Sequence, residues 1–245
     1  MINEDFRKMA LSQYGCDGGN LASKIWTCGL EWGGGYDDNQ IKSSDMKELA
    51  LGAWDLDGES VIDSLAAQYN QKLAWFFSYL FKWDVSKYTD EAVKYGLFCH
   101  NGIGYKMNAF PLSYKNRNSV SWEQKTKDLI GLHSFEIYKE WCIQERGKYF
   151  QKLASTHSPK LILCTGITST MEFIRFFGCD LESYREIKGI NLAKTNKGNT
   201  LVMVVPFFGG ANGINSYEKM EALVNVVNSE CSEYFNSSNW MGKIQ

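Results

Sequence analysis

The sequence predicts an α/β protein with three layers, in which helices cover both faces of a mainly parallel central sheet. Apolar runs of strand length at residues 24–30, 161–165 and 201–205 alternate along the chain with segments of helical periodicity. Each run leads into a loop that contains glycine, as strands do at the carboxyl edge of open α/β sheets. The 245 residues, 44% of them apolar, suffice for one large domain over residues 1–245.

The first half of the chain is expected to be rich in helix. Residues 2–13 have the pattern of a short amphipathic helix, and the turn-rich residues 14–20 separate it from the first strand, residues 24–30. Residues 43–95 form a predicted helical insertion, because apolar side chains recur there at helical spacing. The side chains that we expect to pack on the sheet are Val61, Leu65, Tyr69, Leu73, Phe76, Phe77 and Leu80.

The second half alternates between the two kinds of element. We expect a strand within residues 96–108, a long helix at 122–153, a strand at 161–165, a helix at 170–177, two strands within 185–205 separated by a turn at 195–199, and a final helix at 217–234. Thr168 or Ser169 is placed to cap the helix that follows Gly166, and Ser216 to cap the last helix. This alternation favours parallel pairing in the centre of the sheet.

Composition narrows the partners and cofactors. The net charge of −2 gives no overall basic surface, although a local group of Lys and Arg would suffice for contacts with nucleic acid phosphates. No C-x-x-C pair occurs and the three histidines lie far apart, so we expect no metal site and no cofactor. The seven cysteines are Cys16, Cys28, Cys99, Cys142, Cys164, Cys179 and Cys231.

The same features favour a cytoplasmic protein. An odd number of scattered thiols fits a reducing compartment better than a disulfide scaffold. Residues 1–5 lack the basic and apolar regions of a signal peptide, and no apolar run is long enough to span a bilayer. We therefore expect no contact with membranes and no obligate protein partner.

The first of three loops that follow strands carries a carboxylate. It runs from Cys28 to Gly35, with Glu31 and Trp32 ahead of three glycines. A carboxylate at this position lies at the mouth of a crevice, where it can activate water or stabilise a developing cation. The alternative is that Glu31 caps the next helix or forms an ion pair with it.

The other two loops offer amides and bare backbone. Asn108 ends the second strand, and its amide presents a donor and an acceptor together, as the reading of a heterocycle edge requires. The alternative is an Asn that closes a turn before Pro111. The third loop, residues 206–213, contains no acid, base or histidine. With Asn212, Asn215 and two aromatic side chains, it can seat a phosphate, wedge a base stack apart or simply turn the chain.

The order of these loops resembles the uracil-DNA glycosylase superfamily over roughly residues 21–230. Cys28–Gly33 is similar to that family's water-activating motif, where Gly-x-Asn-Pro-Gly or Gly-Gln-Asp-Pro is usual. Met107–Leu112 is similar to its base-reading motif, especially the Asn-x-x-Pro-Leu form of the single-strand-selective branch. Pro159–Gly166 matches the strand–helix unit before the last motif, and Val205–Gly213 takes the place of the His-Pro-Ser-Pro intercalation loop.

The chain departs from the family pattern at several positions. Glu31 stands where Asp or Asn is usual, and Trp32 replaces a proline. Residues 203–216 contain no histidine, so the family's leaving-group stabilisation is absent or passes to Asn212, Asn215 or backbone N–H groups. In the strict uracil enzymes of the family, an aromatic side chain excludes substituted pyrimidines. The corresponding positions here are Gly33–Gly35, which suggests a roomier base pocket unless Tyr36 fills that space.

The resemblance implies a DNA glycosylase that flips a base out of single- or double-stranded DNA and leaves an abasic site. Glu31 and Asn108 are then the catalytic pair, one orienting water and the other bonding the base edge. The implied base-binding residues are Asp17, Gly29, Leu30, Trp32, Gly33, Tyr36 and Phe110. The implied DNA-binding and intercalating residues are Pro206, Phe207, Phe208, Gly209, Asn212 and Asn215. No lysine stands at a motif position that suggests a Schiff base, so the implied enzyme is monofunctional.

Uracil is the default substrate of the family, and hydroxymethylated or glucosylated cytosine of phage DNA is the alternative that a wide pocket favours, as in anti-phage members of the group. Two other classes of function stay open. One is a DNA- or nucleotide-binding regulator without chemistry, and the other is a hydrolase of free nucleosides or nucleotides. A dinucleotide-binding enzyme is disfavoured because G-x-G-x-x-G is missing, and a glycoside hydrolase because no second partnered carboxylate is evident.

Overall fold

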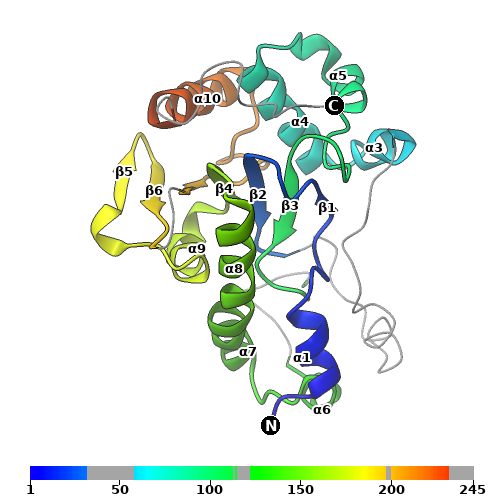
Figure 1. The fold of residues 1–245 in the computed structure, drawn as a ribbon, viewed down its shortest axis with the longest axis vertical. Helices are drawn as coiled ribbons and strands as arrows, with labels where there is room; N and C mark the ends of the chain where they lie inside the picture. Colours follow the sequence, from blue (N-terminus) through cyan, green and yellow to red (C-terminus); the bar gives the residue numbers. More distant parts are fainter. Residues whose placement is uncertain (32–57, 113, 115–121, 197–199, 232–245) are drawn as a thin grey trace.

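The computed structural model describes residues 1–31, 58–112, 114, 122–196 and 200–231. In this part of the chain, seven strands form one sheet in the order β1-β3-β2-β4-β7-β6-β5 (Figure 1). The strands are β1 (Gly18–Gly19), β2 (Ile25–Gly29), β3 (Tyr105–Asn108), β4 (Leu161–Thr165), β5 (Arg185–Ile187), β6 (Ile190–Lys194) and β7 (Leu201–Val205). The central four pair in parallel, whereas β1, β6 and β5 are antiparallel to their neighbours. The α/β class with a mostly parallel centre is confirmed.

Helices cover both faces of this sheet (Figure 1). They are α1 (Glu4–Ala10), α3 (Gly58–Ser64), α4 (Gln68–Phe81), α5 (Tyr88–Lys94), α6 (Gln124–Ile130), α7 (Phe135–Trp141), α8 (Gly147–His157), α9 (Thr170–Phe176) and α10 (Tyr217–Cys231). A π-helical turn, Cys142–Arg146, joins α7 to α8 without interruption. The predicted insertion at 43–95 corresponds to α3, α4 and α5, and its residues 43–57 lie outside the described ranges.

Side chains of the parallel strands alternate between two apolar cores. On the α4 face, Leu163 and Met203 pack with α4 and α10, and on the opposite α8 face, Ile162 and Val202 pack with α1 and α7–α9. Because both faces are covered, the strands are apolar at nearly every position, which is why runs such as Leu161–Thr165 were recognisable in the sequence.

Two predicted elements differ in the structure. Residues 185–205 hold three strands rather than two, because a tight hairpin turn at Lys188 and Gly189, both with positive φ, separates β5 from β6. The predicted helix over 122–153 is divided, because Gly131 adopts a left-handed conformation after α6 and Ser134 accepts a hydrogen bond from the Ile137 N–H to begin α7.

The two predicted helix caps have different outcomes. Ser216 accepts a hydrogen bond from the Lys219 N–H at the start of α10, as expected. Neither Thr168 nor Ser169 caps α9 with its side chain, because both belong to a 3-10 turn that precedes this helix. The residues of the predicted last helix beyond 231 lie outside the described part of the chain.

A completely buried arginine ties the N-terminal segment to the end of β3. The Arg146 side chain extends from the π-helical turn and lies over the Phe150 ring, 4.8 Å from its centroid. Its guanidinium donates hydrogen bonds of 2.6 to 3.2 Å to five backbone carbonyl oxygens, those of Ala10, Ser12, Tyr14, Asn108 and Ala109. No ion pair among the described residues involves Arg146, so its charge is compensated by these carbonyl dipoles, the Phe150 ring and the Cys16 sulfur.

No membrane-crossing helix and no metal-binding group emerge from the described residues. None of their helices combines the length and apolar character that a bilayer crossing requires. They also contain no group of three or more His, Cys, Asp or Glu side chains arranged to hold a metal ion. All seven cysteines are free thiols, and six of them are buried.

Replacing Arg146 with Met should destabilise the fold by at least ~3 kcal/mol, because carbonyl groups that now accept charged hydrogen bonds would be buried without donors. Urea unfolding followed by circular dichroism measures the change. Arg175→Met is the matched control, since Arg175 forms only an exposed pair with Glu140 and its loss should cost about 1 kcal/mol or less. Equal losses in the two variants would contradict the structural role of Arg146.

The thiols should differ sharply in reactivity. Burial raises the pKa of Cys16 and Cys164, and it raises the pKa of Cys179 and of Cys231 to about 12, which leaves little thiolate at pH 8. Cys99 is the one partly exposed cysteine. An Ellman titration of the native protein at pH 8 should therefore show one fast thiol per chain. Cys99→Ser should remove this phase and Cys179→Ser should leave it intact.

Candidate active site

The carboxyl ends of the parallel strands meet at one edge of the sheet, which we name the carboxyl edge. Strand β2 lies between β3 and β4, and the chain continues from β2 toward β3 but from β4 toward β7. The two connections thus leave in opposite directions, and in open α/β sheets ligands bind at such a switch point. The first and second sequence loops begin here, at the ends of β2 and β3.

Backbone hydrogen bonds join the first loop to the second. The Ala109 N–H donates to the Gly29 carbonyl oxygen over 3.0 Å, and the Phe110 N–H donates to that of Leu30 over 2.8 Å. These bonds continue the β2–β3 pairing past the strand ends and hold the backbone at Glu31 beside the second loop. The two loops that sequence reasoning assigned to one site are therefore adjacent.

Glu31 lies on the α8 side of this junction and is partly buried. Its negative charge contributes, after burial and neighbouring groups, to raising the pKa of Tyr138, a residue of α7. The Glu31 carboxylate is thus close enough to act electrostatically on the Tyr138 hydroxyl, which accepts a hydrogen bond from the Leu112 N–H. The expected neighbours Trp32, Gly33 and Tyr36 lie outside the described residues.

Asn108 is buried between the two strands and the N-terminal segment. Its Nδ2 donates to the Gly15 carbonyl oxygen over 2.7 Å, and its Oδ1 lies against Gly29, only 2.5 Å from where a Cβ on Gly29 would stand. The amide nitrogen of Asn108 is therefore bonded to the backbone, as in the alternative in which this residue closes a turn. The amide oxygen faces the end of β2.

Phe110 and Leu30 are packing residues in this structure. Phe110 is 2% exposed, and its ring packs against Tyr138 at a centroid distance of 6.1 Å. Leu30 is partly buried, with its Cδ1 beside Gly166. Phe110 thus belongs to the core on the α8 face and offers no exposed ring on which a base could stack.

The third loop separates its two phenylalanines. Phe208 is 1% exposed and packs into the core on the α4 face beside Phe76, whereas Phe207 is 53% exposed and stacks on Tyr69 at 5.5 Å and 13°. Of the two, only Phe207 has the exposure that an intercalating wedge needs. This corrects the expectation that either ring could fill the role.

The rest of the third loop is closed by its own hydrogen bonds. The Ile214 N–H donates to the Phe207 carbonyl oxygen, and Asn215 Nδ2 donates to that of Gly210. Pro206 is partly buried and Asn212 is exposed. Gly209, with φ +145°, takes a conformation that L side chains rarely adopt. Asn212 is therefore the more available of the two predicted asparagines.

Sequence reasoning named Asp17 but missed the other members of a polar cluster on the α4 face of the carboxyl edge. Lys106 Nζ is 2.9 Å from Asp17 Oδ1, donates to Asn70 Oδ1 over 2.8 Å and lies 5.4 Å from the Tyr69 ring centroid. We name this the Lys106 cluster; its members are Asp17, Thr27, Tyr69, Asn70, Lys106 and Thr165. The signal in the sequence is the alternation of polar Lys106 and Asn108 with apolar residues along β3.

Strand register brings the members of the Lys106 cluster together. Thr27 is paired with Lys106, and Gly29 with Asn108, so these four positions share the α4 face. At the end of β4, the Thr165 hydroxyl is 2.9 Å from that of Tyr69. Burial raises the pKa of Tyr69, so its hydroxyl stays protonated at neutral pH and can donate.

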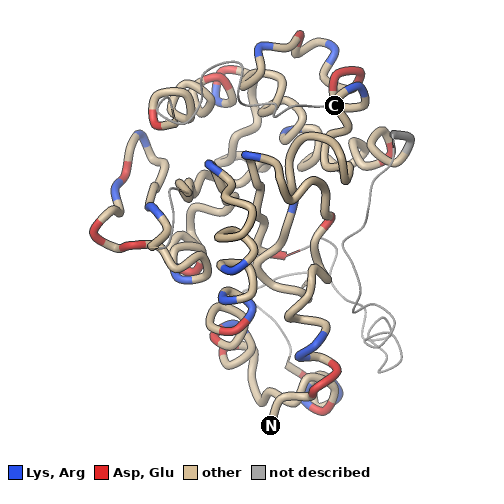
Figure 2. Tube along the Cα trace, in the orientation of Figure 1, with Lys and Arg blue, Asp and Glu red and all other residues tan. Residues whose placement is uncertain are grey.

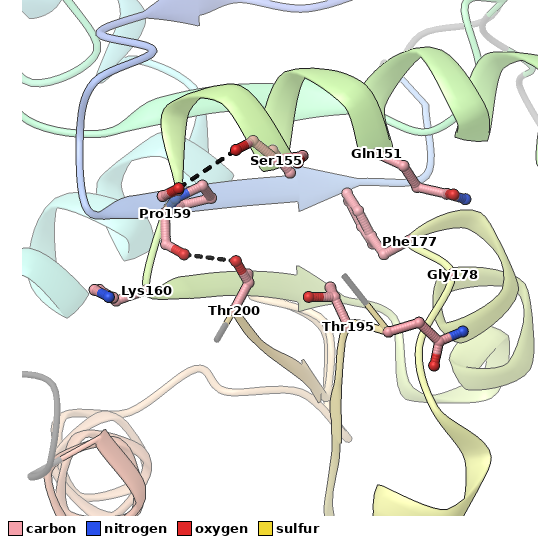
Figure 3. A pocket seen from close by; sticks show the side chains of 11 residues that line it. Gln151, Ser155, Pro159, Lys160, Phe177, Gly178, Thr195 and Thr200 are labelled. Carbon is pink, nitrogen blue, oxygen red and sulfur yellow. Dashed lines mark hydrogen bonds between the residues drawn. The ribbon is translucent and has the colours of Figure 1, made fainter. Parts of the chain in front are cut away.

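A cavity of about 200 Å³ lies at the opposite, amino edge of the sheet (Figure 3). Its walls include Gln151, Ser155, Lys160 and Phe177, and Thr200 there donates to the Pro159 carbonyl oxygen over 2.7 Å. None of the predicted site residues lines this cavity. Among the described residues, no acidic one lines this cavity, whereas Glu31, Asp17 and Asn108 lie at the carboxyl edge, where we place the candidate active site.

Comparisons with known proteins do not add a family to this picture. No family model, no curated protein and no solved structure matches the chain. The functional argument therefore rests on the residues and on their geometry.

Gly29→Ala should destabilise the protein by about 1–3 kcal/mol, because the new Cβ would clash with Asn108 Oδ1 and nothing else stands closer. A double-mutant cycle with Asn108→Ala isolates the cause. Once the amide is gone, adding Gly29→Ala should cost less than about 0.5 kcal/mol by urea unfolding. Additive losses would mean that the two groups do not oppose each other in the folded protein.

Proposed function

We propose that the protein is a DNA glycosylase, which hydrolyses the N-glycosidic bond of a base extruded from DNA. The observation that carries the proposal is the junction of the first two loops at the switch point of the sheet, with Glu31 and Asn108 on adjoining backbone. A carboxylate and an amide at this edge are the groups that the resemblance to the uracil-DNA glycosylase superfamily requires.

In the proposed reaction the bond between C1′ and the base nitrogen breaks, and its electron pair leaves with the base. Glu31 stabilises the oxocarbenium-like sugar and orients water, whose oxygen bonds to C1′ while its proton passes to the carboxylate. Asn108 Oδ1 accepts a hydrogen bond from the base edge. The product is an abasic site with an intact phosphate backbone.

The third loop supports contact with DNA. Phe207 presents an exposed ring, held by its stack on Tyr69, that is suited to fill the gap left by a flipped base. The exposed Lys219 contacts the same loop, since its Nζ lies 2.9 Å from the Gly213 carbonyl oxygen. Elsewhere, basic and acidic residues are interspersed along the outer helices (Figure 2), so we infer that phosphate contacts are local.

Two observations favour a second function, that of a DNA-binding protein without catalytic activity. The Asn108 amide donor is engaged by Gly15, and residues 203–216 contain no histidine. A protein of this kind would slow the migration of DNA in a gel-shift assay but would form no abasic site. An enzyme acting on free nucleosides would instead show turnover without binding oligonucleotides.

The test uses end-labelled single- and double-stranded oligonucleotides that carry uracil, hydroxymethylcytosine or glucosylated hydroxymethylcytosine. After incubation, hot alkali and a denaturing gel reveal abasic sites. We expect cleavage at one of these bases in single-turnover experiments, and Glu31→Gln should lower its rate at least ~100-fold because the amide cannot take a proton from water. Glu136→Gln, at an exposed position of α7, is the control and should keep the wild-type rate.

A wild-type rate in Glu31→Gln would remove the catalytic role of that residue. Binding of all the oligonucleotides without any cleavage would instead support the non-catalytic function. Circular dichroism of each variant shows whether it is folded, so that a loss of activity can be distinguished from unfolding.

A further inference from the structure

The Lys106 cluster contains a cation in an unusually enclosed place. The Lys106 side chain is 10% exposed, and it lies on β3 two residues before Asn108, on the same face of the sheet. Burying an ammonium group is costly unless partners compensate it, and here Asp17 and Asn70 do so. Because burying this ammonium group costs desolvation free energy, we expect a chemical role for Lys106 beside the candidate active site.

Three polar groups of the cluster have unused hydrogen-bonding capacity among the described residues. Lys106 has three N–H donors, and its hydrogen-bond and ion-pair partners there are Asp17 and Asn70. Thr27 Oγ1 and Asp17 Oδ2 are buried, and neither atom has a hydrogen-bond partner in the described part of the chain. Thr27 is completely buried and stands level with Lys106 across the β2–β3 pair. Buried groups of this kind usually have a partner, so the cluster is built to receive one.

The position of the cluster identifies that partner by its chemistry. Asn108, next along the same face of β3, is the proposed base-reading residue, and the Tyr69–Phe207 stack borders the cluster on the helix side. A base held by Asn108 would therefore direct a carbonyl oxygen toward the free donor of Lys106. The cluster therefore complements a carbonyl oxygen of the base that lies beside the N–H bonded by Asn108 Oδ1.

We propose, given the function above, that Lys106 is a further catalytic residue, which hydrogen-bonds a carbonyl oxygen of the departing base. When the N-glycosidic bond breaks, its electron pair spreads over the base and places negative charge on this oxygen. The ammonium group stabilises that charge without transferring its proton, and the base anion takes a proton from solvent after release. This supplies the anion stabilisation that no histidine in residues 203–216 can provide.

The test compares uracil with 5-fluorouracil in otherwise identical oligonucleotides. The fluorinated base is the better leaving group, because fluorine stabilises its anion, and so it depends less on help from the enzyme. Lys106→Met should slow single-turnover excision of uracil ~100-fold, with a clearly smaller loss for 5-fluorouracil. Lys106→Arg, which keeps the charge, should recover part of the rate, and Lys148→Met, at an exposed position of α8, should keep the full rate for both bases.

Equal losses for both bases would overturn the role of Lys106 while leaving the glycosylase intact. Because Lys106→Met leaves Asp17 without its cation, Lys106→Met/Asp17→Asn provides a second variant with no uncompensated charge, and it should show the same unequal losses. Melting temperatures confirm that each variant is folded.

A second measurement separates this proposal from the proposed function. If the wild type excises neither base, calorimetric titration with free uracil tests whether Lys106 binds the base, independently of catalysis. Binding that Lys106→Met weakens at least tenfold and Lys148→Met leaves unchanged would retain the base-binding cluster and reject the glycosylase. No binding, or binding insensitive to Lys106→Met, would overturn the proposal.

Discussion

The buried guanidinium of Arg146 is the constraint on which the candidate site depends. Five carbonyl oxygens converge on one side chain. Three come from the last residue of α1 and the segment after it, and two from the last residue of β3 and the residue that follows it. Each such bond to a charged donor is worth about 1.5–3 kcal/mol, and together they offset a desolvation cost of several kcal/mol. The N-terminal segment is held against β3 by this group, and Gly15 and Asp17, the partners of Asn108 and Lys106, lie on that segment.

This arrangement gives the carboxyl edge two sides with different chemistry. Glu31 lies on the α8 side, where its charge acts on Tyr138, whereas Asp17 lies on the α4 side and pairs with Lys106. Asn108 stands between them. The proposed cleavage of an N-glycosidic bond creates positive charge on the sugar and negative charge on the base, and such a separation would set the carboxylate near the one and the ammonium group near the other.

The parts that the sequence predicted well are those that depend on burial. The strands of the parallel centre have apolar runs because both faces are covered, and the ends of parallel strands meet at one edge, so the first two loops had to be close. The β5–β6 turn was missed because Lys188 is an unusual residue for a positive φ. The burial of Phe110 and Phe208 was not predicted, because the alternation of inward and outward side chains stops where the strand ends. The burial of Arg146 was not predicted either, because its sequence context is that of an ordinary polar residue in a helix.

The Lys106–Asp17 pair explains how a cation can be kept in an enclosed place at the carboxyl edge. The Lys106 side chain is only 10% exposed, and Asp17 Oδ1, 2.9 Å from its Nζ, offsets the cost of burying the ammonium group. The Asn70 side chain accepts a second hydrogen bond from the same ammonium group. Because these two partners already hold the ammonium group in place, the proposed role in stabilising a base anion requires little reorganisation when the negative charge develops.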